Sequence, residues 1–213
     1  TLGRNFSRSI ETVKAFEIGK TFSRNLTDPE GLPDEQDALA IGCYGKGIDF
    51  FTLKGMIVEM LRVMGIHDVM FTPESEYGVY HPGRCARISF KGEELGIMGE
   101  IHPEVSDRYE IGTRCYCAEF MFDAVIRHAK TEASYTPLPK YPSTARDIAL
   151  LVDENQSVGE LEETIKANGK DILERVKLFD IYRGAQVAEG KKSVAFTLTY
   201  RDVNKTLTDE DVA

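Results

Sequence analysis

The feature that most constrains the fold is the segment from residue 131 to 143, TEASYTPLPKYPS. It holds three prolines in thirteen residues. Proline lacks a backbone N–H and disfavours helix at the residue before it. The segment shows neither a helical nor an alternating hydrophobic pattern, which is typical of a linker. The sequence therefore predicts two domains, residues 1–130 and residues 144–213, rather than one continuous sheet.

Residues 1–130 carry strand patterns interleaved with helix patterns. Strands are expected over residues 13–22, 38–44, 69–71, 87–90, 95–100 and 115–122. The clearest helix covers residues 49–64, where apolar residues recur at three- and four-residue steps after Asp49, a candidate N-cap. Shorter helices are expected after His102-Pro103 and after Asp123, which is expected to cap the second. The pattern predicts an α+β domain built on a largely antiparallel sheet.

Residues 144–213 follow a simpler order. A strand is expected over 146–152, a helix from Ser157 to about residue 168, and strands over 176–182 and 193–200. Ser157 followed by Glu160 indicates a capping box, and a second helix is expected from Thr208. The order β-α-β-β-α is one strand short of a ferredoxin-like split βαβ unit. We therefore expect a ferredoxin-like domain truncated at its C-terminus, with its first strand at a sheet edge.

Charge and spacing exclude several function classes. The net charge is −9, divided as −6 up to residue 138 and −3 beyond it, so neither half has the basic excess of a non-specific nucleic-acid binder. The four cysteines and four histidines lack metal-ligand spacing, so no metal site is expected. No apolar run approaches the roughly 20 residues of a membrane span. Residues 1–10 lack a signal core and an initiating Met, which indicates a piece of a longer chain.

Several motifs together indicate a family. In the second half they are YPSTARDIALLVDENQSVGELEETIKANG, KLFDIYRG, EGKKSVAFTLTYRD and KTLTDEDV. In the first half they are FEIGKTF, DFFTLKGMIVEMLRVMGI, HPGRCARI and GIMGEIHPEV. The first group resembles the anticodon-binding domain of bacterial phenylalanyl-tRNA synthetase β subunits, and the second resembles the synthetase-like core domain of the same subunits. The resemblance runs in the right order over nearly the whole chain.

The resemblance implies a C-terminal fragment of such a subunit, with its class II synthetase-like core truncated at the N-terminus. In the family, two α and two β subunits form a heterotetramer that joins phenylalanine to tRNA(Phe) with ATP and Mg²⁺. The α subunit holds the aminoacylation site. The expected roles here are support of the α subunit and recognition of the tRNA anticodon, in the cytoplasm and without DNA or membrane partners.

The core is expected to lack catalytic and cofactor-binding residues. Class II synthetases clamp the ATP phosphates with arginines on two motif strands, since cations stabilise phosphoryl charge. Here the first such strand keeps Glu17 but has no arginine before it, and the second, residues 116–123, has neither glycine nor arginine and ends in Asp123. The parent complex is a ligase, while this fragment alone is expected to be inactive. The sequence leaves open whether the fragment is itself to be counted as an enzyme.

The open face of the expected second sheet supplies the candidate RNA contacts. Alternation places Val194, Phe196 and Leu198 against the helix and Thr197, Thr199 and Arg201 on the open side. At the end of one strand, Tyr182 and Arg183 are candidates to stack on bases and to pair with phosphate. At the start of another, Arg146 and Asp147 are expected to form a mutual or a cross-sheet ion pair. The candidates are Arg146, Tyr182, Arg183, Thr197, Thr199 and Arg201. Lys191 and Lys192 are expected to form a solvated cationic rim.

Two alternatives stay open at the level of sequence. The segment His81-Pro82-Gly83-Arg84 fits a phosphate or partner contact, but a turn with Arg84 in a structural ion pair is preferred. The second half also fits a free-standing ferredoxin-like module that binds a small ligand or regulates another protein.

Overall fold

The computed structural model describes residues 1–213 except 25–30, 131, 133–134, 136, 185 and 213. The chain divides into two compact units, residues 1–134 and residues 135–213, and each is described by itself. No helix within the described ranges is long and apolar enough to cross a bilayer. Four residues of the expected linker (131, 133–134 and 136) lie outside the described ranges, and residues 137–143 form neither helix nor strand.

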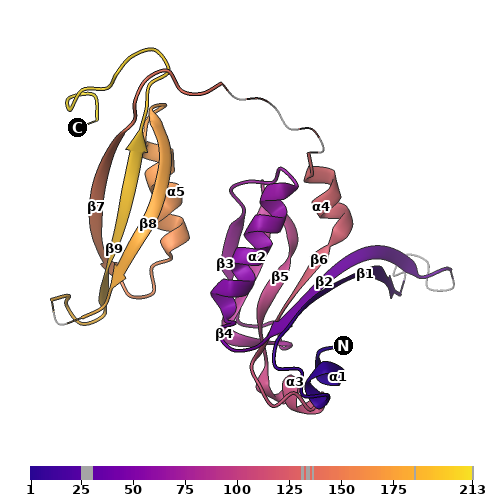
Figure 1. The fold of residues 1–213 in the computed structure, drawn as a ribbon. Helices are drawn as coiled ribbons and strands as arrows, with labels where there is room; N and C mark the ends of the chain where they lie inside the picture. Colours follow the sequence, from indigo (N-terminus) through magenta and orange to yellow (C-terminus); the bar gives the residue numbers. More distant parts are fainter. Residues whose placement is uncertain (25–30, 131, 133–134, 136, 185, 213) are drawn as a thin grey trace. The chain divides into compact units, whose positions relative to one another are not determined.

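The first unit is a six-stranded antiparallel sheet with helices (Figure 1). The strand order across the sheet is β1-β2-β6-β5-β4-β3. The elements in chain order are α1 (Leu2–Ser7), β1 (Val13–Ser23), β2 (Asp34–Tyr44), α2 (Phe50–Val63), β3 (Met70–Pro73), β4 (Tyr80–Phe90), β5 (Glu93–Ile101), α3 (Pro103–Arg108), β6 (Cys115–Met121) and α4 (Phe122–His128).

The main core lies between one face of this sheet and the helices α2 and α4. The expected helix start is confirmed, because the Asp49 carboxylate accepts a hydrogen bond of 2.7 Å from the Thr52 amide. Leu53, Ile57 and Leu61 then point from one side of α2 into the core and are fully buried. Burial of such an apolar stripe is what holds a 14-residue helix on the sheet.

The strands expected over 87–90 and 95–100 are longer in the structure, and as β4 and β5 they form a hairpin with a tight turn. Only Lys91 and Gly92 separate the strands, and both have positive φ, 51° and 82°. Two consecutive residues of this kind form the turn whose twist matches that of the paired strands. β4 begins at Tyr80 rather than at residue 87, so the His81–Arg84 segment belongs to the strand and not to a separate turn.

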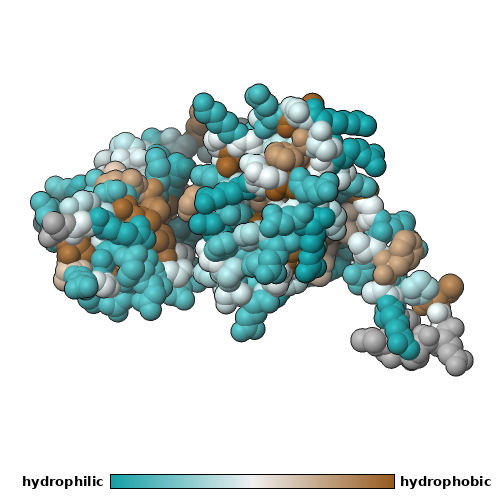
Figure 2. Space-filling view, turned by 90° about the horizontal axis from the view of Figure 1, so that it is seen from below, coloured by the Kyte–Doolittle hydropathy of each residue, from teal (hydrophilic) through white to brown (hydrophobic). Residues whose placement is uncertain are grey.

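Hydrophilic residues form most of the surface seen in Figure 2. Hydrophobic residues reach that surface at the outer end of the β1–β2 hairpin, where Phe22 and Leu32 are exposed.

The second unit contains β7 (Thr144–Asp153), α5 (Val158–Asn168), β8 (Leu173–Tyr182) and β9 (Lys191–Tyr200). Its sheet is antiparallel in the order β7-β9-β8. Val194 and Phe196 on the central strand are fully buried against apolar residues of α5. This is the order of the first three strands of a split βαβ unit. The expected α+β class and the ferredoxin-like second unit are therefore confirmed.

The expected start of α5 after Ser157 is confirmed, whereas its capping box and two other expected helix starts are corrected. Met121, not Asp123, precedes α4, and no side chain caps it. Ser157 precedes α5 without a capping bond, and the Glu160 carboxylate instead accepts from the Gln156 amide at 2.6 Å. No helix follows Thr208 in the described residues; its amide and hydroxyl donate to Asp211 at 2.9 and 3.0 Å in a turn. The Asp211 side chain already satisfies the donors at the start of this turn. Helix nucleation is unfavourable, so the segment stays a single turn.

Candidate functional site

The open face of the second sheet is built from cross-strand rows. In an antiparallel sheet, directly opposed residues point to the same side. One row joins Ala145, Thr199 and Arg175, and the next joins Asp147, Thr197 and Lys177. The Thr197 hydroxyl donates to the Asp147 carboxylate at 2.6 Å, which leaves its oxygen as an acceptor. The two predicted threonines therefore lie together on the face away from α5.

Arg175 and Lys177 are candidate residues that the sequence reasoning missed. Both are exposed, and neither forms an ion pair with another residue in the described part of the chain. Each lies beside one of the two threonines through the pairing of β8 with β9. Alternation with the half-buried Val176 was the signal available in the sequence.

A bulge in β8 brings Tyr182 to the same face. The register shifts between Leu178 and Asp180, so Phe179 is the extra residue. Tyr182 then lies opposite Ser193, with 41% of its surface exposed. In a regular strand Tyr182 and Lys177 are five residues apart and point to opposite faces. The bulge therefore puts the aromatic ring of Tyr182 on the same face of the sheet as Arg175 and Lys177.

The three predicted arginines are occupied by ion pairs. The Arg146 guanidinium pairs with Asp209, and Arg146 lies opposite Leu198, on the α5 side of the sheet. Of the two expected alternatives, the mutual ion pair of Arg146 with Asp147 is wrong; Asp147 instead accepts a hydrogen bond across the sheet from Thr197. Arg183 donates to Glu154 at 2.6 Å.

Arg201 follows β9 and is held at two points. Its Nε donates to Glu174 at 2.9 Å and its Nη1 donates to the Tyr141 carbonyl at 2.5 Å. The guanidinium therefore ties the segment before β7 to the start of β8. A bound phosphate has to compete with both contacts.

Lys192 corrects the expectation of a solvated cationic rim. It is only 5% exposed, and its ammonium donates to the carbonyls of Glu154 and Gln156 at 2.8 and 2.7 Å. Lys191 remains at the surface, in an ion pair of 2.7 Å with Asp153. Neither ammonium stands ready for a ligand.

In the first unit, the face of the sheet away from α2 and α4 carries carboxylates. Glu17, Ala40 and Glu119 share one cross-strand row and line a pocket of about 380 Å³. The Tyr80 hydroxyl donates to Glu119 at 3.1 Å, and burial together with the Glu119 charge raises the pKa of this phenol. No Lys, Arg or His side chain is found among the described residues that line this pocket.

This pocket does not fit a nucleoside triphosphate. A triphosphate needs guanidinium or ammonium groups around its phosphates. Lys14 is opposite Cys43 and so points to the other face of the sheet from Glu17, and Asp123 lies in the first turn of α4. Carboxylates facing the cavity repel phosphate. The residues that line this pocket therefore do not fit ATP.

The cysteines and histidines show no reactive arrangement in the described chain. Burial raises the pKa of the Cys43 and Cys85 thiols to about 11 and that of Cys117 to about 12, so these thiols are neutral near pH 7. No group of three or more metal-ligating side chains occurs in the residues that the structure covers. Arg84 forms an ion pair of 3.0 Å with Glu100, as the structural interpretation of the His81–Arg84 segment required.

Comparison with known families decides the identity of the chain. Residues 1–122 match the family model described as the phenylalanyl tRNA synthetase beta chain CLM domain. The chain belongs to the phenylalanyl-tRNA synthetase beta chain family. Residues 139–213 match a second model, the ferredoxin-fold anticodon binding domain. The two matches follow the order of the two units and of the two motif groups in the sequence.

Curated relatives carry the same family name over the whole chain. The phenylalanine–tRNA ligase beta subunit of Clostridium acetobutylicum is 44% identical over 100% of this chain and 26% of its own length. That of Clostridium tetani is 43% identical over 99% of this chain and 26% of its own. The chain thus spans about a quarter of the length of these relatives. The solved pyrrolysyl-tRNA synthetase of Desulfitobacterium hafniense has a TM-score of 0.48 and 20% identity, over 59% of this chain and 44% of that one.

Proposed function

We propose that this section of a phenylalanine–tRNA ligase β subunit positions tRNA(Phe) for aminoacylation and performs no bond-making itself. The open face of β7-β9-β8 contacts the anticodon region, and the first unit supports the α subunit. The whole ligase, with two α and two β subunits, works in the cytoplasm with ATP and Mg²⁺. ATP binds elsewhere in that complex, because the carboxylate pocket beside Glu17 repels phosphate.

One observation carries the proposal: the open face places hydroxyls beside two cations that have no ion-pair partner in the described chain. Thr199 presents its hydroxyl to sugars, phosphates and base edges, and Thr197, whose proton goes to Asp147, offers its oxygen as an acceptor to sugar hydroxyls and base N–H groups. Arg175 and Lys177 in the same rows bind phosphate oxygens. Tyr182 supplies one stacking surface instead of the several aromatics of a stacking platform.

The three predicted arginines keep a place in the proposal, with altered roles. Arg201 orders the start of β8, and thereby Arg175, through its bond to Glu174. Arg146 and Arg183 reach RNA only by exchanging Asp209 and Glu154 for phosphate. The proposal includes a division of the chain into a core (1–130), a linker (131–143) and an anticodon-binding domain (144–213). The alternative, a free-standing regulatory module, is not favoured, since both family models belong to one synthetase architecture.

The test is Lys177→Ala in the complete ligase that contains this sequence. We expect the KM for tRNA(Phe) to rise about three- to tenfold, as for the loss of one charged contact. The rate of phenylalanine-dependent ATP–pyrophosphate exchange, which requires no tRNA, stays unchanged. Lys191→Ala is the matched control, because Lys191 already pairs with Asp153. An unchanged KM in Lys177→Ala, or an equal rise in the control, contradicts the proposed interface.

A further inference from the structure

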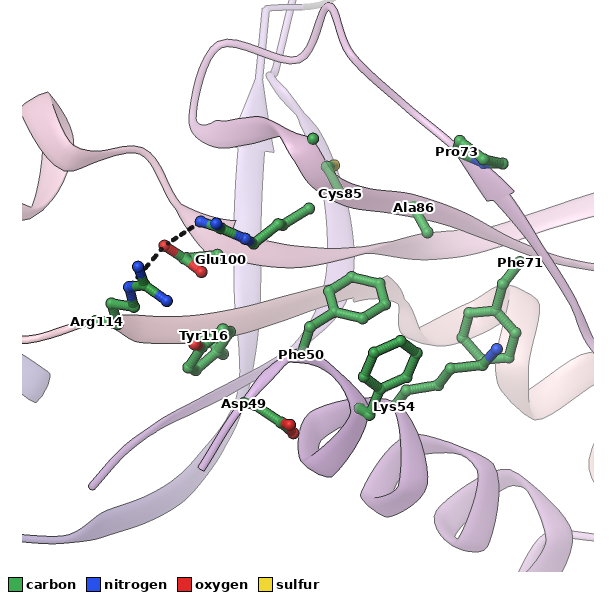
Figure 3. Close-up of a pocket in the computed structure, with 13 residues that line it drawn as sticks. Asp49, Phe50, Lys54, Phe71, Pro73, Cys85, Ala86, Glu100, Arg114 and Tyr116 are labelled. Carbon is green, nitrogen blue, oxygen red and sulfur yellow. Dashed lines mark hydrogen bonds and ion pairs between the residues drawn. The ribbon is translucent and has the colours of Figure 1, made fainter. Parts of the chain in front are cut away.

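The first unit contains a second pocket, of about 440 Å³, that shares no lining residue with the pocket beside Glu17. The start of α2 and the strands β3, β4, β5 and β6 form its walls. Figure 3 shows the Glu100 carboxylate on one side of this pocket and the rings of Phe50 and Phe71 on the other. The pocket therefore has a charged end and an aromatic end.

The charged end is built around a buried carboxylate that is only half satisfied. Glu100 is 4% exposed. Its Oε1 lies 3.0 Å from Nη1 of Arg84 and 3.7 Å from Nε of Arg114. Its Oε2 has no hydrogen-bond partner among the described residues. A buried carboxylate oxygen without a donor is costly and unusual, so this end of the pocket calls for an N–H donor.

The Arg114 guanidinium is a second cation at this end, and it is exposed to solvent. Its side chain is 69% exposed, and its 3.7 Å contact to Glu100 is longer than a hydrogen bond. The closer Arg84 is enough to hold Glu100 in place. When Arg114 turns outward to a carboxylate, it uncovers the carboxylate of Glu100 for an ammonium group. A ligand that carries both groups then gives Arg114 an anionic partner and gives Glu100 a further N–H donor.

The aromatic end fits a flat apolar group. The rings of Phe50 and Phe51 meet edge to face, with centroids 5.5 Å apart and planes at 87°. Phe51 is 73% exposed, so a large apolar ring stands at the edge of the pocket. The Lys54 ammonium lies 4.4 Å from the centre of the Phe71 ring and covers part of it. Edge-to-face packing of a further ring is favourable in such surroundings.

We propose that this pocket binds a free aromatic α-amino acid. The ammonium group donates to Glu100, the carboxylate pairs with Arg114, and the ring lies between Phe50 and Phe71. The volume falls in the range of small-molecule sites. The proposal goes beyond the RNA-binding role and is independent of it, because none of these residues belongs to the second unit.

The test is a calorimetric or NMR titration of the 213-residue chain with L-phenylalanine. We expect saturable binding to one site, with 2-phenylethylamine (no carboxylate), 3-phenylpropionate (no ammonium) and L-alanine (no ring) each binding about tenfold more weakly or worse. Absence of saturable binding up to about 10 mM L-phenylalanine, a concentration well above ordinary weak affinities, overturns the proposal. Equal binding of 3-phenylpropionate overturns it as well.

Variants locate the site. Glu100→Gln is expected to weaken L-phenylalanine binding about tenfold. Arg114→Gln changes an exposed side chain, so the chain still folds; it should weaken L-phenylalanine by a similar factor and should not weaken 2-phenylethylamine, because Arg114 competes with an ammonium group for Glu100. Glu74→Gln is the control, because the Glu74 carboxylate is mostly buried and ion-paired, with Arg87 at 2.6 Å, but lines no part of the pocket. Equal affinity of Arg114→Gln and the parent chain for L-phenylalanine places the ligand elsewhere and overturns the assignment.

Discussion

At the scale of single residues, one lysine of the second unit, Lys192, has a structural role, because its ammonium fastens the connection between β7 and α5. Lys192 lies opposite Val152, on the α5 side of the sheet, and its ammonium is held by two backbone carbonyls between β7 and α5. Those carbonyls otherwise need a donor of their own. The adjacent Lys191, with the same chemistry, stays at the surface. Position relative to the sheet, not residue type, separates the two roles.

Lys192→Met is therefore expected to destabilise the second unit by about 2 kcal/mol, through the loss of hydrogen bonds from a charged donor. Hydrogen exchange of the β9 amides measures this change directly in that unit. Lys191→Met should alter the same amides by less than about 0.5 kcal/mol, since exposed ion pairs contribute little. Similar effects of the two substitutions refute the fastening role.

At the scale of elements, β5 depends on glycine where two backbones meet. A Cβ at Gly96 lies 2.2 Å from the Glu119 carbonyl oxygen and 3.0 Å from the Cα of Phe120, both in β6. Because backbone atoms have no rotamer to adopt, the strands must separate to admit a methyl group. Glycine inside a strand marks this kind of close approach. The pairing of β5 with β6 at the centre of the first sheet therefore requires a residue without a side chain at Gly96.

Gly96→Ala is expected to lower the free energy of unfolding of the first unit by about 2–3 kcal/mol, the range of overpacked sites. Exchange of the β5 and β6 amides reports the loss. Gly19→Ala is the matched control within the same sheet, because nothing lies within 4 Å of its Cβ; a change below about 0.5 kcal/mol is expected there. A neutral Gly96→Ala rules out the close contact.

At the scale of the whole molecule, charge limits how RNA is held. The chain carries a net charge of −9, and its residues from 139 onward carry −3. Long-range attraction cannot supply the affinity, so binding depends on a few local contacts and on shape. On the open face, Arg175 and Lys177 are the cations for which the described chain offers no ion-pair partner. In the proposed RNA-binding role, this sheet therefore neutralises about two phosphates.

Salt dependence tests that number. Each neutralised phosphate contributes about −0.7 to −0.9 to the slope of log affinity against log salt. Replacing both Arg175 and Lys177 by Ala in the complete ligase should make the slope for tRNA(Phe) shallower by about 1.4 to 1.8. An unrelated tRNA serves as the reference ligand. If the slope does not change, these cations do not contact phosphate.

The sequence by itself determined the local order of this protein. Alternation in residues 193–200 assigned Val194 and Phe196 to the core, and Asp49 marked the start of the long helix, because such patterns depend only on neighbours along the chain. The motif groups assigned the family, since they hold its residues in order. Each of these features depends on residues that are close together in the sequence.

The tertiary structure decided which side chains are available for function. The bulge at Phe179 placed Tyr182 on the same face of the sheet as Lys177, and distant carboxylates occupied Arg146, Arg183 and Arg201. Burial withdrew Lys192 from solvent. Each outcome depends on a partner far away in sequence or on a one-residue shift in pairing. The hydrophobic alternation along one strand predicts neither the distant partner nor the shift, because register and ion pairs are determined only when whole strands pack.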